Sequence, residues 1–124
     1  MAEQRTQLVC VVDDDESLRR SVRNLLSSVG VRVETFASAE EFLESTQRAS
    51  AGCLVLDLGM AGMNGLDLLN HLAATGSRIP VIILTAHGGE EARRRSLEAG
   101  AVAFLEKPFR SNALLDAVRT ALGV

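Results

Sequence analysis

The chain of 124 residues has the length of one domain, and with 47% hydrophobic and 23% charged residues it has the composition of a folded protein. No apolar run approaches the roughly 18 residues that cross a bilayer, and the polar N-terminus has no signal-peptide core, so we expect a cytoplasmic protein without membrane contact. A net charge of −3 argues against direct nucleic-acid binding by this domain.

Short apolar runs alternate with amphipathic segments along the whole chain. Cys10 and Cys53 both fall inside apolar runs, which predicts two buried thiols. The apolar runs predict strands at 7–12, 31–36, 53–57, 81–85 and 101–105. The amphipathic segments between and after them predict helices from Leu18 to Val29 with Gly30 as the cap, after the capping-box spacing of Ser38 and Glu41, at 90–99 and at 111–122. A further helix between the third and fourth strands has a stripe of Leu66, Leu69, Leu72 and Ala73 and is closed by Gly76.

These five strand–helix pairs predict a fold class. Strands that alternate with helices are typical of a doubly wound α/β domain, a (βα)5 unit with a parallel sheet and helices on both faces. We expect residues 1–124 to form this one domain. In such sheets, ligands bind beyond the carboxyl ends of the strands.

Polar residues follow four of the five predicted strands. An acidic run, residues 13–16, follows the first strand, Asp57 ends the third and Thr85 ends the fourth. Glu106 and Lys107 follow the fifth, and Lys107 is the one lysine beside 12 arginines. Arginine and lysine differ as donors, so the isolated lysine suits a chemical requirement. A preference for arginine set by genome composition would explain the same count equally well.

Carboxylates that meet at one sheet edge repel one another and need a cation. Oxygen ligands without imidazole or thiolate suit a hard ion such as Mg²⁺, and a lysine beside them suits an anionic group. The set therefore predicts phosphoryl chemistry with Asp57 as the nucleophile. Taken alone, the run from Asp13 to Glu16 also fits an acidic first turn that favours a helix N-terminus.

Four stretches carry a resemblance to a known family. VVDDDES at 11–17, LVLDLGM at 54–60, ILTAHG at 83–88 and FLEKPF at 104–109 resemble the response-regulator receiver domain, the CheY-like fold of two-component signalling. GMNGLDLL at 62–69 and EKPF are most similar to the FixJ/NarL-type subgroup. The resemblance covers nearly the whole chain and implies a sheet of order 2-1-3-4-5.

The resemblance also implies a role for each site residue. Asp57 is then the phospho-acceptor, and Mg²⁺ is bound by Asp57, by Asp14 directly, by Asp13 partly through water, and by the backbone carbonyl of Gly59. Thr85 binds a phosphoryl oxygen once Asp57 is modified. Lys107 pairs with Asp57 at rest and with the phosphoryl group afterwards.

Phe104 occupies the aromatic switch position of the family, and the bond between Lys107 and Pro108 is expected to be cis. Two positions depart from the family pattern. Ala61 stands where the family usually has proline, which frees φ and restores an N–H. Phe104 lacks the hydroxyl of a tyrosine, so its rotation would depend on packing alone.

Two surface features leave two interpretations open. His87, two residues past Thr85, is either a plain loop residue or a group that touches a water attacking the phosphoryl group. The basic run from Arg93 to Arg95 is either a solvated helix face or a contact surface. Its spacing allows the pairs Glu90–Arg94 and Glu91–Arg95.

We therefore expect a phosphorylation switch. Its expected partners are a sensor histidine kinase, a second copy of the chain after phosphorylation, and a helix-turn-helix output domain if the protein is longer. A phosphohydrolase of the haloacid-dehalogenase type would need a second Asp where Gly59 stands and a cap that is not visible. An unphosphorylated interaction module would need a broken site, and all the site residues are present.

Overall fold

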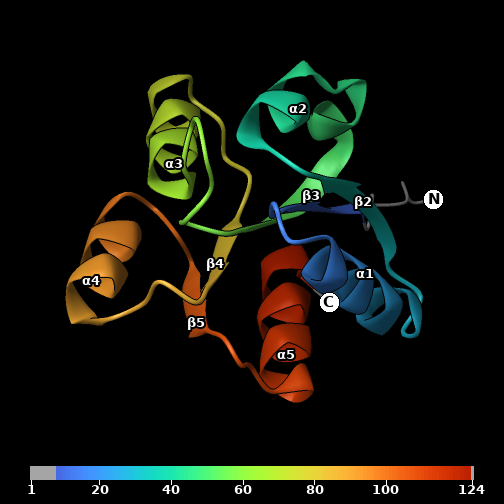
Figure 1. The fold of residues 1–124 in the computed structure, drawn as a ribbon. Coiled ribbons are helices and arrows are strands. Elements are labelled where there is room, and N and C mark those ends of the chain that lie inside the picture. Colours follow the sequence, from blue (N-terminus) through green and yellow to red (C-terminus); the bar gives the residue numbers. More distant parts are fainter. Residues whose placement is uncertain (1–7, 124) are drawn as a thin grey trace.

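The computed structural model describes residues 8–123, and within them it contains a five-stranded parallel sheet of order β2-β1-β3-β4-β5 (Figure 1). This confirms the doubly wound class that the sequence pattern predicts and the strand order that the family resemblance implies. Gln7 of the first predicted strand lies outside the described residues. The elements are β1 (Leu8–Val12), α1 (Glu16–Ser27), β2 (Arg32–Phe36), α2 (Ala39–Glu44), a 3-10 helix (Thr46–Ser50), β3 (Ala51–Leu56), α3 (Gly65–Ala74), β4 (Val81–Thr85), α4 (Glu90–Glu98), β5 (Ala103–Glu106) and α5 (Ser111–Leu122).

The sheet is covered on both faces (Figure 1). Helices α2, α3 and α4 cover one face and α1 and α5 cover the other. Successive residues of β1 point to opposite faces, so Leu8, Cys10 and Val12 pack with the first set of helices and Val9 and Val11 with the second. All five are buried, as expected for a central strand of a parallel sheet.

The two cysteines are buried free thiols, as predicted. They belong to opposite faces of the sheet, Cys10 on the α2–α3–α4 side and Cys53 on the α1–α5 side. Burial raises the pKa of Cys10 to about 11 and that of Cys53 to about 12. Both therefore remain protonated and unreactive near neutral pH.

Several predicted boundaries shift by one to three residues. Helix α1 ends at Ser27, and Val29 lies beyond it with 43% of its surface exposed, although its spacing fits the helix. Gly30 follows with a φ of 85°, so it ends the turn after the helix rather than capping the helix itself. Strand β5 begins at Ala103, and the preceding Val102 is 57% exposed.

Among residues 8–123, no helix has the length and apolar character needed to cross a membrane.

The start of α3 is packed directly against the backbone that carries Asp57. Gly65 is the first residue of the helix, and its N–H donates to the carbonyl of Leu58 at 3.1 Å. A Cβ at Gly65 would lie 2.1 Å from the carbonyl oxygen of Asp57. Asn64 and Asp67 form a capping box at this helix end. The buried stripe is Gly65, Leu68, Leu69 and Leu72, and the predicted core residue Ala73 is exposed.

We predict that Gly65→Ala destabilises the fold by about 3 kcal/mol, because the methyl group forces backbone apart at a packed contact. Gly76→Ala is the matched control: nothing lies within 4 Å of a Cβ there, and its φ of 82° alone should cost about 1 kcal/mol. Urea denaturation measures both. Equal losses in the two variants would contradict the close packing at Gly65.

Candidate functional site

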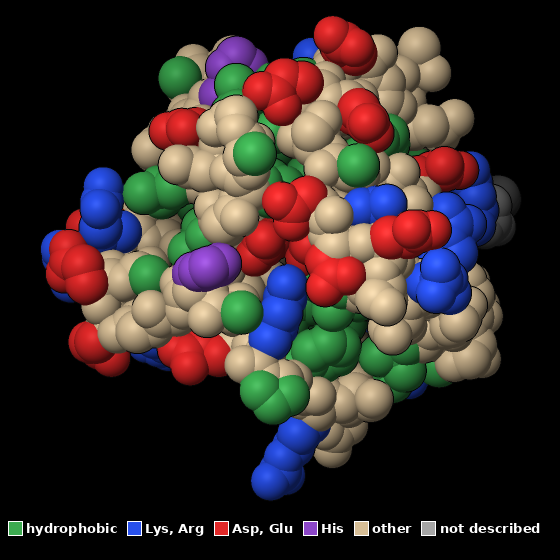
Figure 2. All heavy atoms as spheres, in the orientation of Figure 1, with side chains coloured by type: hydrophobic (Ala, Val, Ile, Leu, Met, Phe, Trp, Pro, Cys, Tyr) green, Lys and Arg blue, Asp and Glu red, His purple; other side chains and the backbone are tan. Residues whose placement is uncertain are grey.

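The carboxyl edge of the sheet brings three carboxylates together. Asp13 follows β1 and Asp57 follows β3, and the two are 2% and 5% exposed, whereas neighbouring Asp14 is exposed. One carboxylate oxygen from each of the three lies within 4.8 Å of the others. Figure 2 shows acidic side chains gathered at the centre of this face, with a basic side chain reaching among them.

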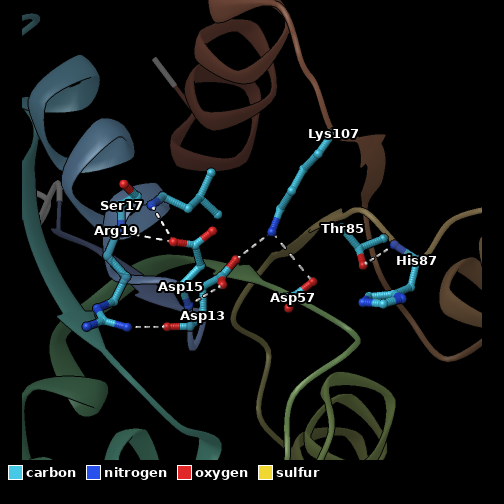
Figure 3. Close-up of polar contacts among 9 residues, drawn as sticks. Asp13, Asp15, Ser17, Arg19, Asp57, Thr85, His87 and Lys107 are labelled. Atoms are coloured by element: carbon cyan, nitrogen blue, oxygen red, sulfur yellow. Dashed lines mark hydrogen bonds and ion pairs between the residues drawn. The ribbon is translucent and has the colours of Figure 1, made fainter.

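Lys107 supplies the positive charge of this cluster. Its Nζ donates to Asp13 Oδ2 at 2.9 Å and lies 3.8 Å from Asp57 Oδ1 (Figure 3). Its side chain is 19% exposed. The resemblance implies a resting pair between Lys107 and Asp57, but in this structure the shorter contact is with Asp13. The ammonium therefore bridges both buried carboxylates. The peptide bond between Lys107 and Pro108 is cis.

The two buried carboxylates differ in their hydrogen bonds. Asp13 accepts from Lys107 and, through Oδ1, from the N–H of Asp15 at 2.9 Å. Burial raises the pKa of Asp13 and the charge of Asp57 adds to this, although the bonds from Lys107 and Asp15 act in the opposite direction. Asp57 Oδ1 finds no hydrogen-bond partner among the described residues. A buried carboxylate oxygen without a donor is costly, so it favours a cation or a new covalent bond at that atom.

The acidic run after β1 divides into two uses. Asp15 is the N-cap of α1 and accepts from the N–H groups of Ser17 and Leu18. Glu16 forms an exposed i,i+4 pair with Arg20. The interpretation as a helix N-terminus is therefore correct for Asp15 and Glu16, whereas Asp13 and Asp14 belong to the carboxylate cluster.

Thr85 ends β4 and is fully buried. Its Oγ1 accepts from the backbone N–H of His87 at 3.0 Å, which leaves the hydroxyl proton free to donate (Figure 3). The imidazole of His87 lies against Gly59, where a Cβ would meet its ring at 2.2 Å. His87 is an exposed residue of the loop after β4 with its ring over Gly59, and its contact with an attacking water stays a prediction. Phe104 is half-buried on β5 and packs against the α2–α3–α4 side of the core.

Glu106 does not join the carboxylate cluster, contrary to the predicted convergence of acidic residues. Its Oε2 accepts from the N–H of Gly89 at 2.9 Å, at the start of α4. In the sequence, the consecutive glycines Gly88 and Gly89 are the feature that could have indicated a close contact at the start of α4. A Cβ at Gly88 would lie 2.3 Å from Glu106 Oε2, and the φ of Gly89 is 112°.

The residues of the cluster fit a divalent cation of the hard class. The donors are carboxylate oxygens from Asp13, Asp14 and Asp57, and no group in the described part of the chain donates to the buried Asp57 Oδ1. Histidine and cysteine are absent from this donor set, which disfavours zinc or copper and suits Mg²⁺. The backbone carbonyl of Gly59 as a further ligand stays a prediction.

Comparison with known proteins finds a matching family and relatives of this chain. The family model described as "Response regulator receiver domain" matches residues 9–119. Nodulation protein W of Bradyrhizobium diazoefficiens is 49% identical over 111 residues, which cover 90% of this chain and 49% of that protein. The transcriptional regulatory protein FixJ of Azorhizobium caulinodans is 42% identical, over 93% of this chain and 54% of that protein.

The crystal structure of FixJ-N has the same fold. It superimposes with a TM-score of 0.85 at 37% identity and covers 94% of this chain and 93% of that one. The chain thus matches nearly all of the FixJ-N chain, whereas it spans about half the length of the curated relatives it matches.

We predict that Mg²⁺ raises the melting temperature, because it binds the folded cluster and relieves repulsion between the carboxylates. At ten times the dissociation constant, linkage gives about 1.4 kcal/mol of added stability. Asp14→Asn should reduce this shift strongly, whereas Asp116→Asn, a change of an exposed aspartate on α5, should leave it intact. Differential scanning fluorimetry with Mg²⁺ and with a chelator measures the shift. A wild-type melting temperature indifferent to millimolar Mg²⁺ would contradict the site.

Proposed function

Since the chain belongs to the family of response-regulator receiver domains, we propose that it accepts a phosphoryl group on Asp57 from a histidine kinase and that Mg²⁺ binds at Asp13, Asp14 and Asp57. The observation that carries this proposal is the buried Asp57 Oδ1, which has no hydrogen-bond donor within residues 8–123 and lies beside the Lys107 ammonium. A carboxylate oxygen without a hydrogen-bond donor has its lone pairs available for nucleophilic attack. After the transfer, the Lys107 ammonium can pair with the anionic phosphoryl group on Asp57.

In the transfer, an oxygen of Asp57 forms a bond to phosphorus while the bond from phosphorus to the donor's imidazole nitrogen breaks. The donor nitrogen leaves with the electron pair and takes up a proton. Lys107, already between the two buried carboxylates, remains within reach of the negative charge that the transfer brings to Asp57. Mg²⁺ held by Asp13, Asp14 and Asp57 would neutralise further negative charge on the phosphoryl oxygens.

Thr85 and Phe104 would then change position in response to phosphorylation of Asp57. The Thr85 hydroxyl already accepts from the N–H of His87, so its own proton is available to a phosphoryl oxygen. That bond would draw Thr85 and the following loop toward Asp57. Phe104, half-buried on the neighbouring strand, would follow by packing alone, because it has no hydroxyl to exchange. The element that shifts is a two-state switch biased by local charge.

The proposal treats the domain as a switch that assists only its own phosphorylation and dephosphorylation. A phosphatase acting on separate substrates would need an acid/base group near Asp57 on the same loop. Gly59 stands at that position, and the ring of His87 fills the space over it. A water that approaches Asp57 over Gly59 would therefore meet the ring of His87.

The surroundings of the domain also belong to the proposal. Relatives of about twice the length include a protein named as a transcriptional regulator, which supports an output domain of the helix-turn-helix type outside residues 1–124. The domain itself, with its net charge of −3, would not bind nucleic acid, and it would act in the cytoplasm with a sensor kinase. Phosphorylation would favour a homodimer.

We predict that acetyl phosphate with Mg²⁺ adds one phosphoryl group to the protein and that Asp57→Asn abolishes the addition. The asparagine keeps the shape of the side chain but removes the nucleophilic oxygen. Intact-mass spectrometry counts the added groups. Asp67→Asn, which changes an exposed aspartate at the start of α3, is the control and should be labelled like the wild type. Equal labelling of Asp57→Asn would exclude this acceptor.

A second prediction concerns the dimer. Arg94 pairs with Glu91 and Glu98 of its own helix, in place of the expected Glu90–Arg94 and Glu91–Arg95 pairs. The structure places no such pair at Arg93 or Arg95 within residues 8–123, so these two exposed charges are the ones free to meet a second copy.

Reversal of both charges, Arg93→Glu with Arg95→Glu, should weaken the phosphorylated dimer at least tenfold and leave labelling of Asp57 unchanged. The same reversal at Arg48 and Arg78, both exposed and away from α4, is the control. Sedimentation velocity measures the dimer. A phosphorylated wild type that stays monomeric at high micromolar concentration would rule the homodimer out, and an unaltered dimer in the α4 variant would place its contact elsewhere.

A further inference from the structure

Helix α4 buries fewer residues than any other α-helix in the described part of the chain. Ser96 is the one residue that it buries completely, whereas α1 and α5 each bury two aliphatic side chains. The Oγ of Ser96 is fully buried and finds no hydrogen-bond partner within residues 8–123. An unpaired buried hydroxyl disfavours the packed position of this helix.

The N-terminus of α4 has no capping side chain of its own. Its N-cap is Gly89, and most helices have Ser, Thr, Asp or Asn there. In this protein, the acceptor comes from another element, because Glu106 at the end of β5 accepts from the Gly89 N–H. A carboxylate at this end of a helix is also favoured by the helix dipole.

The two glycines make this contact sterically feasible. The carboxyl group of Glu106 occupies the space where any other residue at position 88 would carry its Cβ. At Gly89, the φ of 112° is one that side-chain-bearing residues rarely adopt. The loop between β4 and α4 is thus shaped to receive Glu106.

Glu106 also belongs to the strand end that carries the active-site lysine. It pairs in register with Thr85 of β4. The next residue, Lys107, donates its backbone N–H to the Thr85 carbonyl at 2.9 Å and its Nζ to Asp13. A displacement of Thr85 or Lys107 is therefore transmitted by covalent and hydrogen-bonded backbone to Glu106.

We propose that Glu106 is a positioning residue that fixes the N-terminus of α4 to the active-site end of β5, so that changes at Asp57 reach α4 through it. The fixation of α4 by Glu106, called the tether below, concerns the unmodified protein alone. The transmission of changes from Asp57 to α4, called the coupling, rests on the proposed function. The link needs neither Phe104 nor a contact between α4 and the phosphoryl group.

The tether is tested in the unmodified full chain by residue-resolved amide hydrogen exchange. Glu106→Ala should speed exchange in the first turn of α4 about fivefold, the effect of a lost cap. Glu106→Gln keeps a carbonyl oxygen that accepts from Gly89, so it should stay within twofold of the wild type. Glu44→Ala, the same change at an exposed glutamate on α2, should have no effect on α4. Exchange in Glu106→Ala equal to that in Glu44→Ala would overturn the tether.

The coupling is tested after treatment with acetyl phosphate and Mg²⁺, with labelling checked by intact mass. Phosphorylation should speed α4 exchange about fivefold in the wild type and less than twofold in equally labelled Glu106→Ala. A full response in Glu106→Ala would overturn the coupling. A wild type that takes up no phosphoryl group would refute the proposed function and the coupling with it, whereas the unmodified comparison would still decide the tether.

Discussion

Asp13 and Asp57 are almost fully buried at one sheet edge, and the ammonium of Lys107 lies within 4 Å of both. Two like charges removed from water repel each other strongly, and removal of a single counter-charge leaves them uncompensated. The apolar strands beneath them must therefore hold the site against this repulsion. The buried residues of β1, β3 and β4 on both faces of the sheet supply that rigidity.

The same constraint explains why the site is assembled from distant parts of the chain. Asp13, Asp57 and Lys107 each follow a different strand, and the parallel order of the sheet brings the three strand ends to one edge. Gly65 then allows α3 to pack closely against the backbone of Asp57. Position in the fold, more than local sequence, determines which carboxylates are buried.

Periodicity alone predicted the strands and helices well, because apolar spacing directly reflects burial in a two-faced sheet. The strand order came from the family resemblance and is confirmed by the structure. Side-chain pairing was less predictable. Arg94 forms ion pairs with Glu91 and Glu98 and not with Glu90. Lys107 lies closer to Asp13 than to Asp57. Glu106 accepts a hydrogen bond at the start of α4. These choices depend on rotamers and on neighbours far away in the chain, which spacing does not encode.

The isolation of Lys107 has an experimental consequence. It is the one lysine of the 124-residue chain, so its ε-amino group is the single side-chain amine of the domain. Amine-directed isotope labelling, such as reductive methylation with a ¹³C reagent, would thus place a side-chain signal at the centre of the carboxylate cluster. That nucleus would report on the charge beside Asp57 in the natural sequence, without an engineered cysteine or a fluorophore.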